Sequence, residues 1–484
     1  MSKRPAWSSS RSRRFKPITD PVTLLHDGRK IRAQRGEPVA VALLAAGRLL
    51  LARSPKLHRP RGPFCLRGAC DGCLARVDGE PNIMTCLVRA EDGMRVETQN
   101  VLGARRADLL RATDYMFPQG FDHHRLLAGT PVLGAAMQHI ARQVAGLGRV
   151  PESLPGGAGE PSHTAARART PDVLIVGAGH SGAQVALQLK QRAPALELLL
   201  VDSAFEAGGC HALCEPERWQ PLAERLQAAG VEVELESCVV GLYLRPEQAR
   251  QPTALLSMPP CGSDSTRQLA VVHPRAVVLA VGGHDYVALF EGNDLPGIFS
   301  ARAALYALRL GVLVGQNIVL VGGGAELEAF SAAAGAQAQI TRVSEASMRR
   351  ATGRSRVTGA VVQVEGEPQT LPADAIVVGG PRAPAFELAV QAGLAVRFQH
   401  DVGYIPVPQG YNIGPAQPSP AEPPADPSGS TAPTPVFLAG SVWREAAKTD
   451  GDGDTGAADD SQSTTHATGD DPVSSILGFL GVGG

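Results

Sequence analysis

Four cysteines crowded into one short stretch constrain this chain more than any other feature. Cys65, Cys70, Cys73 and Cys86 follow the spacing C-x4-C-x2-C-x12-C, and the other four cysteines are scattered. A secreted disulfide scaffold would spread its cysteines differently. The pattern therefore predicts a shared metal centre in a reducing compartment, and we expect a cytoplasmic protein.

The order of the first three cysteines favours an iron–sulfur centre. Plant-type ferredoxin loops begin with the same C-x4-C-x2-C, and their fourth ligand arrives later from an adjoining strand. Gly68 and Gly72 would let the loop wrap a cluster and point backbone N–H groups at its sulfurs. Arg67 and Arg76 would add positive potential to balance the negative charge of thiolates and sulfides.

A zinc site with four cysteine ligands is the alternative. Cys70 and Cys73 alone would fit one zinc knuckle. Zinc sites usually pair two such knuckles, however, and Cys65 and Cys86 form no second one. The spacing therefore favours a 2Fe–2S cluster held by the four cysteines.

A glycine-rich turn between an apolar strand and a helix predicts a dinucleotide site. The turn Gly177–Gly182 (GAGHSG) follows the strand Val173–Val176, and Asp202 ends the next predicted strand. In this arrangement the first glycine makes the turn, the second admits the pyrophosphate, and the third lets helix and strand approach. The helix N-terminus would support the phosphates, and Asp202 would accept the ribose hydroxyls. The predicted contacts are Gly177, Ala178, Gly179, His180, Ser181, Gly182 and Asp202.

Three later segments are typical of flavoproteins with such a turn. Gly208-Gly209 forms a further turn, and Val277–Gly283 is an apolar strand ending at Gly283. Thr434–Ser441 resembles the segment that brings the ribityl and phosphate region of FAD against the chain, through Gly440 and Ser441. Because Ser441 replaces the usual acidic residue, FAD and NAD both remain open for this site.

A second glycine turn, Gly322–Leu327 (GGGAEL), follows another apolar strand. It predicts a second Rossmann subdomain with Gly322 and Gly324 as nucleotide contacts. Leu327 stands where a third glycine is usual and would push the helix away from the strand. Glu326 would repel a pyrophosphate. The pattern leaves two interpretations open: a bound NAD(P) or a vestigial site.

The bulk numbers set limits on partners and layout. The formal net charge of −1 gives no reason to expect nucleic acid as a partner. No apolar run approaches the ~20 residues of a transmembrane helix. The basic stretch Ser8–Lys16 leads into no apolar core, so it is no secretory signal. A chain of 484 residues has room for roughly three domains.

The expected fold class is α/β. A β-grasp ferredoxin-like domain at the N-terminus precedes a flavoprotein fold with two dinucleotide-binding, Rossmann-type domains. The predicted segments are a disordered basic tail (1–20), the 2Fe–2S ferredoxin-like domain (21–105), a helical bridge and linker (106–170), the FAD- or NAD-binding Rossmann domain (171–285 plus 433–447), the second, NAD(P)-type subdomain (286–412), a low-complexity insert (413–432) and an acidic low-complexity tail (448–484).

Beyond these motifs, the chain resembles the alpha subunits of heterotetrameric sarcosine oxidase and the related subunits of hydrogen cyanide synthase, opine oxidases and D-hydroxyproline dehydrogenase. The matching pieces occur in the family's order over about residues 53 to 440. They are Arg53–Gly62, Phe117–Phe121, Ala145–Gly148, Phe290–Ala304 and Ala373–Gly393. Many sarcosine oxidase alpha subunits lack cluster cysteines here, so the chain looks more like the cyanide synthase or hydroxyproline dehydrogenase kind. It stops where the sarcosine oxidase chain would continue into a folate-binding half, and we expect no tetrahydrofolate chemistry.

The resemblance implies a division of labour. A separate beta-type flavoprotein would oxidise the C–N bond of an amine or imino acid similar to sarcosine, proline or hydroxyproline. This chain would be the FAD-dependent, electron-transferring subunit of that CH–NH oxidoreductase, with its 2Fe–2S cluster carrying single electrons. Two alternatives remain: a stand-alone NAD(P)H-dependent FAD reductase with a fused ferredoxin domain, and a non-catalytic assembly subunit.

Overall fold

The computed structural model describes residues 13–54, 59–101, 103–104, 107–108, 166–244, 251–259, 268–400, 402–407, 435–439 and 472–482. The chain forms two compact units, each of which is described by itself. Unit 1 comprises residues 1–161 and 285–380, and unit 2 comprises residues 162–284 and 381–484. The predicted insert (413–432) and residues 109–165 of the predicted bridge and linker lie outside the described residues.

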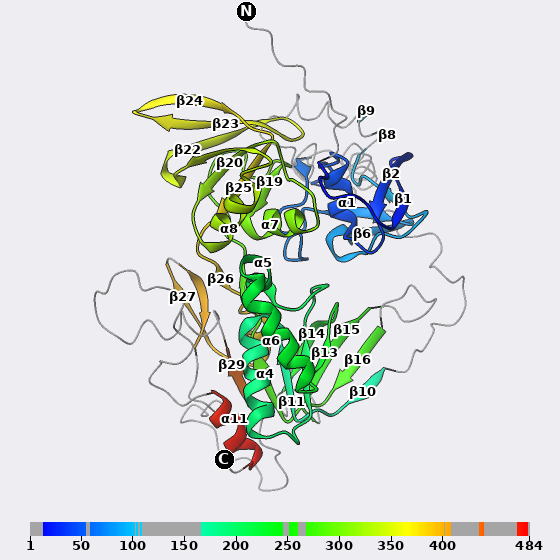
Figure 1. The fold of residues 1–484 in the computed structure, drawn as a ribbon, viewed down its shortest axis with the longest axis vertical. Coiled ribbons are helices and arrows are strands. Elements are labelled where there is room, and N and C mark those ends of the chain that lie inside the picture. Colours follow the sequence, from blue (N-terminus) through cyan, green and yellow to red (C-terminus); the bar gives the residue numbers. More distant parts are fainter. Residues whose placement is uncertain are drawn as a thin grey trace, which may run out of the picture. The chain divides into compact units, whose positions relative to one another are not determined.

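The first part of unit 1 is a mixed five-stranded sheet that holds one short helix (Figure 1). Its strand order is β2-β1-β7-β5-β6, and β1 runs parallel to β7 but antiparallel to β2. The elements are β1 (Pro21–His26), β2 (Arg29–Gln34), α1 (Val39–Ala45), β5 (Leu74–Val77), β6 (Glu80–Met84) and β7 (Arg95–Glu97). All seven residues of α1 are buried, because its Val, Ala and Leu side chains leave no polar face. A helix packed on a mixed sheet of this order is the β-grasp arrangement expected for residues 21–105.

Two Asp-Gly turns set the register of this sheet. Asp27-Gly28 joins β1 to β2, and Asp78-Gly79 joins β5 to β6. All four residues have φ between 47° and 88°. Turns with two left-handed residues match the twist of a hairpin, and Asp-Gly is one of the sequences that adopts them most readily.

The second part of unit 1 is a parallel sheet with the order β19-β25-β20-β21. Helix α7 begins after Ser300, whose side chain accepts the N–H of Ala303 at 3.1 Å as an N-cap. This part of unit 1 also contains an antiparallel three-stranded sheet with the order β22-β23-β24. The elements are β19 (Ile298–Ser300), α7 (Ala301–Arg309), β20 (Asn317–Gly322), α8 (Ala325–Ala334), β21 (Gln339–Val343), β22 (Met348–Gly353), β23 (Val357–Val364), β24 (Glu367–Pro372) and β25 (Ala375–Gly379).

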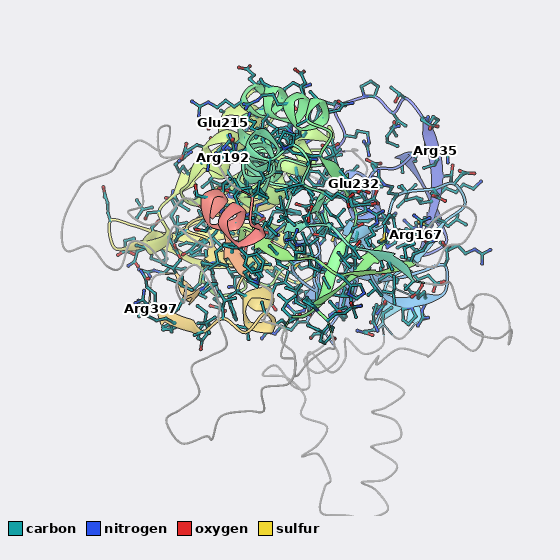
Figure 2. The ribbon with its side chains drawn as sticks, turned by 90° about the horizontal axis from the view of Figure 1, so that it is seen from below. Arg35, Arg167, Arg192, Glu215, Glu232 and Arg397 are labelled. Carbon is teal, nitrogen blue, oxygen red and sulfur yellow. The ribbon has the colours of Figure 1, made fainter. Side chains whose placement is uncertain are left out.

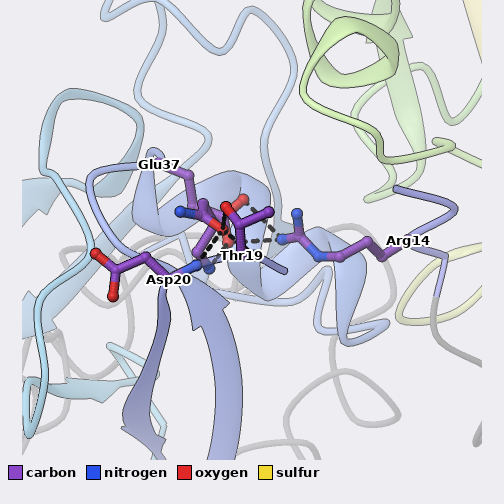
Figure 3. A network of polar contacts seen from close by, with 5 residues as sticks. Arg14, Thr19, Asp20 and Glu37 are labelled. Carbon is purple, nitrogen blue, oxygen red and sulfur yellow. Dashed lines mark hydrogen bonds and ion pairs between the residues drawn. The ribbon is translucent and has the colours of Figure 1, made fainter. Parts of the chain in front are cut away.

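The basic segment at the N-terminus has partners from Arg13 onward, whereas the sequence predicted disorder through residue 20. Arg14 Nη2 contacts the two carboxylate oxygens of Glu37 at 2.6 and 2.7 Å, and Thr19 N–H donates to Gln34 (Figure 3). Arg13 lies 3.6 Å from Asp374 and is almost buried. These carboxylates are distant in the sequence, so composition alone carries no sign of the contacts.

Unit 2 is built on a parallel sheet with the order β13-β12-β11-β17-β29. The strands β11 (VLIV), β12 (LLLV) and β17 (AVVL) are buried at every position. Continuous apolar strands are typical of parallel sheets covered on both faces. The elements are β11 (Val173–Val176), α4 (His180–Arg192), β12 (Leu198–Val201), α5 (Gly209–Cys214), α6 (Pro216–Ala228), β13 (Glu232–Glu234), β17 (Ala276–Leu279) and β29 (Val436–Leu438).

Smaller sheets complete unit 2. The sheet β10-β16-β15-β14 comprises β10 (Arg167–Arg169), β14 (Cys238–Tyr243), β15 (Thr253–Met258) and β16 (Gln268–Val272). Two short ladders pair β18 (Gly283–His284) with β26 (Ala383–Pro384) and β27 (Val396–Gln399) with β28 (Gly403–Pro406). Residues 381–407 thus group with unit 2, whereas the sequence placed them in the second subdomain. The pairing of β18 with β26 joins segments far apart in the chain and has no local signal.

A short helix near the C-terminus, α11 (Pro472–Leu480), packs beside α4 in both views (Figures 1 and 2). Its residues Val473, Ile476, Leu477 and Leu480 are buried in the same core as α4 and β29. Arg192, labelled in Figure 2, donates to Ser474 Oγ at 2.9 Å. The predicted acidic tail (448–484) therefore ends in an apolar helix that completes the core of unit 2.

Candidate cofactor sites

The four predicted cluster cysteines lie in one loop and one short helix of unit 1. Cys65, Cys70 and Cys73 precede β5, and Cys86 lies in a single 3₁₀ turn after β6. Cys65, Cys73 and Cys86 are buried, whereas Cys70 is half-buried. The structure thus brings the predicted residues together, with three of the four thiols shielded from solvent.

The thiols form two hydrogen-bonded pairs, Cys65 with Cys70 and Cys73 with Cys86. The hydrogen bond to Cys70 and burial raise the pKa of Cys65, while the same bond lowers the pKa of Cys70 to about 6. The second pair is polarised in the same way: the pKa of Cys86 is raised and that of Cys73 is lowered by their mutual hydrogen bond. In each pair the hydrogen bond therefore favours the charged form of one thiol, Cys70 or Cys73, over that of its partner.

Backbone N–H groups of the loop point at these sulfurs. Arg67 N–H lies 3.5 Å from Cys65 Sγ, and Gly68 N–H lies 3.2 Å from Cys86 Sγ. Such donors stabilise negative charge on sulfur. Among the described residues, no three His, Cys, Asp or Glu side chains converge as ligands of a single metal ion would. The sulfurs are arranged as two pairs, a donor set that fits a centre with two irons.

Glycine is required at two points of this loop. Gly68 has a φ of +78°, and an added Cβ would lie 2.8 Å from the Leu87 side chain. At Gly72 an added Cβ would lie 2.2 Å from the carbonyl oxygen of Gly62. The predicted roles of the two glycines therefore have a steric basis, since only a residue without Cβ lets the chain wind so tightly.

The two predicted basic residues have different partners. Arg67 Nε lies 3.1 Å from Asp285 Oδ2, and the other oxygen of that carboxylate lies 3.3 Å from Arg302 Nε. Arg76 donates to the carbonyl oxygen of Gly79 at 2.6 Å in the exposed β5–β6 turn. Only Arg67 belongs to the cysteine loop itself.

The first glycine turn of unit 2 has the geometry of a phosphate-binding turn. Gly177 has a φ of +108°, and a Cβ there would lie 2.3 Å from the carbonyl oxygen of Ala280. A Cβ at Gly182 would lie 1.9 Å from the carbonyl oxygen of Gly177, so only glycine lets α4 pack this close. At Gly179 an added Cβ would meet nothing within 4 Å. That open side, at the N-terminus of α4, is where a pyrophosphate would approach.

Asp202 lies at the end of β12, as predicted, but its carboxylate also bonds to the backbone. Oδ2 accepts the N–H of Ala178 at 2.8 Å, and Oδ1 accepts the N–H of Ala204 at 2.9 Å. Each carboxylate oxygen has a second lone pair that can still accept a hydroxyl. Asp202 therefore stabilises the glycine turn and remains able to accept a ribose hydroxyl.

Gly208-Gly209 lies against the first turn. Gly208 N–H donates to the carbonyl oxygen of Ala178 at 2.8 Å, and Gly208 forms an isolated bridge with Gly179. Gly283 is confined too, because a Cβ there would lie 2.6 Å from the carbonyl oxygen of Ala383. Gly440 and Ser441 lie outside the described residues, immediately after the segment that contains β29.

Sequence reasoning predicted His180 at this turn but missed two side chains near it, His211 and Arg382. The ring of His180, the first residue of α4, lies 4.4 Å from the ring of His211, centroid to centroid. Arg382 Nη1 lies 2.8 Å from Cys210 Sγ. Because Arg382 follows Cys210 by 172 residues in the chain, no local pattern could have linked the two.

The second glycine turn, in unit 1, accommodates Leu327. Gly322 has a φ of +88°, and Leu327 is completely buried. Leu327 was expected to push α8 away from the sheet. Instead, Gly379 on β25 leaves space for Leu327 because it has no side chain. A Cβ at Gly379 would lie 2.8 Å from the Leu327 Cβ.

Tyr286 packs over the neighbouring Gly380, where an added Cβ would lie 2.5 Å from the tyrosine ring. Its hydroxyl donates to Glu345 at 2.5 Å, and burial together with Glu345 raises the pKa of Tyr286 to about 12. Glu345 follows β21, the position whose carboxylate usually reads the ribose in this fold. A side chain of the protein itself therefore engages the carboxylate at this position.

Comparisons with known proteins agree with this architecture. Residues 19–101 match the family model described as a 2Fe-2S iron-sulfur cluster binding domain. The L-proline dehydrogenase of P. horikoshii has a similar fold, with a TM-score of 0.62 at 20% identity; the match covers 90% of this chain and 71% of that one. The predicted fold class is therefore confirmed: a ferredoxin-like 2Fe–2S domain followed by a flavoprotein oxidoreductase fold.

Proteins related in sequence identify the family more closely than the fold does. The alpha subunit of sarcosine oxidase from Rhizobium meliloti (strain 1021) is 26% identical over 418 residues, 77% of this chain and 41% of the relative. The HcnA subunit of hydrogen cyanide synthase from Pseudomonas aeruginosa is 37% identical over 79 residues, 16% of this chain and 75% of the relative. The chain belongs to the sarcosine oxidase alpha-like family with a 2Fe–2S domain. It spans less than half the length of the sarcosine oxidase chains it matches. Within the described part of the chain, no helix is long and apolar enough to cross a membrane.

Proposed function

We propose that this chain is the electron-transferring, alpha-type subunit of a heteromeric amine or imino-acid oxidoreductase. Cys65, Cys70, Cys73 and Cys86 hold a 2Fe–2S cluster, and the first glycine turn holds a dinucleotide, FAD in the leading assignment. The observation that carries the proposal is the pairing of the four thiols in a loop whose N–H groups point at the sulfurs.

The cluster assignment follows from the number of thiolate ligands that two irons need. Each iron in such a centre takes two cysteine thiolates. The pairs Cys65–Cys70 and Cys73–Cys86 supply them, and the N–H groups of Arg67 and Gly68 offset the charge on sulfur. Burial of three of the four cysteines keeps water from the centre.

The dinucleotide assignment depends on the room at Gly179 and the helix that begins beside it. The backbone N–H groups at the N-terminus of α4 bind the pyrophosphate, and Asp202 accepts a ribose hydroxyl. FAD, when bound, accepts an electron pair and releases it one electron at a time. NAD at the same turn is the other ligand that this geometry can hold.

The partner assignment depends on the kind of protein that the relatives are. The matching chains of sarcosine oxidase and of opine oxidase are each named as one subunit of their enzyme, so a second subunit belongs to each of those proteins. For this chain we infer a beta-type flavoprotein that oxidises a C–N bond of a substrate similar to sarcosine, proline or hydroxyproline. We assign the oxidation of the C–N bond to that partner and the onward transfer of electrons to this chain.

One experiment tests the assignment. The purified full chain is analysed for iron, acid-labile sulfide, zinc, flavin and nicotinamide, and reduced samples are examined by EPR. We expect about two irons per chain with a reduced-state EPR signal, and loss of both in Cys70→Ser. Cys238→Ser is the matched control, because Cys238 is exposed on β14, outside the cysteine loop. Stoichiometric zinc without iron contradicts the cluster, and strong NADH:dye reduction by the chain alone favours the stand-alone reductase.

A further inference from the structure

A nearly buried carboxylate joins the cysteine loop to helix α7. Asp285, with only 5% of its side chain exposed, lies 3.1 Å from Arg67 Nε and 3.3 Å from Arg302 Nε. Arg302 is 13% exposed and Arg67 is 30% exposed. Two guanidinium groups therefore share one carboxylate, and this triad carries a net charge of one positive unit.

Burial makes this arrangement electrostatically strong. A shielded charge interacts through a lower effective dielectric than a charge in water, so its field is less screened. A carboxylate left without its partners in such a place would be strongly unfavourable. Asp285 thus holds the Arg67 guanidinium in place and cancels part of its charge.

Arg67 links the triad to a sulfur. The same residue whose side chain contacts Asp285 donates its backbone N–H toward Cys65 Sγ at 3.5 Å. A fixed positive charge beside the loop favours the reduced cluster, because reduction adds one negative charge. The carboxylate of Asp285 opposes that effect.

We propose that Asp285 is a positioning residue that sets the reduction potential of the cluster by holding and partly neutralising Arg67. The inference rests on the proposed cluster at the four cysteines. It assigns a specific electrostatic role to a contact between two parts of unit 1.

The chain offers a matched control in a second Arg–Asp pair. Arg61, on β4 (Pro60–Arg61), lies 3.8 Å from Asp294, and the two side chains are 34% and 26% exposed. This pair also joins the N-terminal domain to the 285–380 segment. Its N–O distance is longer than that between Arg67 and Asp285, its carboxylate is more exposed, and it lies outside the cysteine loop. Removing its charge disturbs the same region of unit 1 without altering the Arg67 triad.

The test is an EPR-monitored redox titration of the full chain. We expect Asp285→Asn to shift the potential in the positive direction, because two positive charges are then left without a counter-charge. Arg67→Gln and Arg302→Gln should shift it in the negative direction, because the triad then loses a positive charge. Arg67→Lys should return it toward the wild-type value, and Asp294→Asn should leave it unchanged.

The opposite signs separate an electrostatic role from a merely structural one. Shifts of the same sign in Asp285→Asn and Arg67→Gln, or no shift in either, would overturn the inference. If Asp285→Asn does not fold, the negative shifts in Arg67→Gln and Arg302→Gln decide it, and wild-type potentials in both overturn it. Absence of a cluster from the wild-type chain contradicts the proposed function instead, so the two failures are distinguishable.

Discussion

The two glycine turns begin from the same local pattern, an apolar strand followed by glycines and a helix, yet their surroundings differ. At the first turn Gly182 has no side chain, and α4 lies against the Gly177 carbonyl. At the second turn Leu327 fills that place, and Gly379 on the facing strand lacks the side chain instead. Close packing of helix and strand therefore needs one small residue, which either element can supply.

The polar surroundings of the turns differ as well. Asp202, after β12, bonds to the backbone of its own glycine turn. Glu345, at the matching place after β21, bonds to the hydroxyl of Tyr286, whose ring packs over Gly380. The first carboxylate supports an open turn, whereas the second is engaged by a side chain of the protein. We therefore expect a nucleotide to bind more strongly at the first turn than at the second.

The largest effect is expected at Gly182. Gly182→Val places a Cβ 1.9 Å from the carbonyl oxygen of Gly177, a backbone atom that cannot move without distorting the turn, and we expect a loss of about 4 kcal/mol or more in the stability of unit 2. Gly179→Val, in open space, should leave stability nearly unchanged but weaken nucleotide binding. Trp219 lies in the same core and can report unfolding by fluorescence. A fully stable Gly182→Val would mean that the turn adjusts more easily than its geometry indicates.

At the second turn the sensitive residue is Leu327. Leu327→Ala removes a completely buried side chain, and we expect a loss of about 3 kcal/mol through lost burial and the cavity left behind. Hydrogen exchange of peptides from α8 measures it locally. Gly379→Ala should cost stability as well, because its Cβ would lie 2.6 Å from the carbonyl oxygen of Gly323 and 2.8 Å from the Leu327 Cβ, an atom that Leu327→Ala keeps. Wild-type protection of α8 in either variant would contradict the close packing of helix and strand at this turn.

The two matching carboxylates give a smaller and more selective contrast. Asp202→Ala leaves the N–H groups of Ala178 and Ala204 without this acceptor, and we expect a cost of about 2 kcal/mol with weaker nucleotide binding at the first turn. Glu345→Ala, its counterpart, should cost less because Glu345 bonds to a half-buried hydroxyl. Calorimetric titration with FAD and NAD⁺ measures binding. Equal losses of nucleotide affinity in the two variants would contradict the proposed difference between the turns.

The smallest effect concerns Tyr286 and appears only in alkali. Its pKa is raised to about 12 in the folded chain from an ordinary value near 10. The neutral hydroxyl is therefore favoured by folding, so its contribution is fully present below pH ~10 and is lost as the pH rises through about 12. Tyr286→Phe should lack this loss. Denaturation at pH 9 and at pH 11.5 measures it, and identical pH dependence of the two proteins would rule out the Tyr286–Glu345 bond.

Local patterns in the sequence determined much of this protein. The cysteine spacing predicted a loop that the structure winds around four neighbouring sulfurs, and the two glycine turns appeared where strand–turn–helix patterns were expected. The apolar strands at Val173–Val176 and Leu198–Val201 were recognisable for the same reason. Each of these features depends on residues close together in the chain, where backbone sterics and hydrophobic patterning act directly.

Only the tertiary structure decided which distant residues complete the sites. Asp285 meets Arg67, Gly379 makes room for Leu327, and Arg382 reaches Cys210 across long stretches of sequence. The apolar helix α11 likewise finds its place in the core of unit 2. From a single sequence one can infer that a buried charge needs a partner, because burying it unpaired is unfavourable. The identity of the partner cannot be inferred, since it depends on how the packed strands and helices bring remote segments into contact.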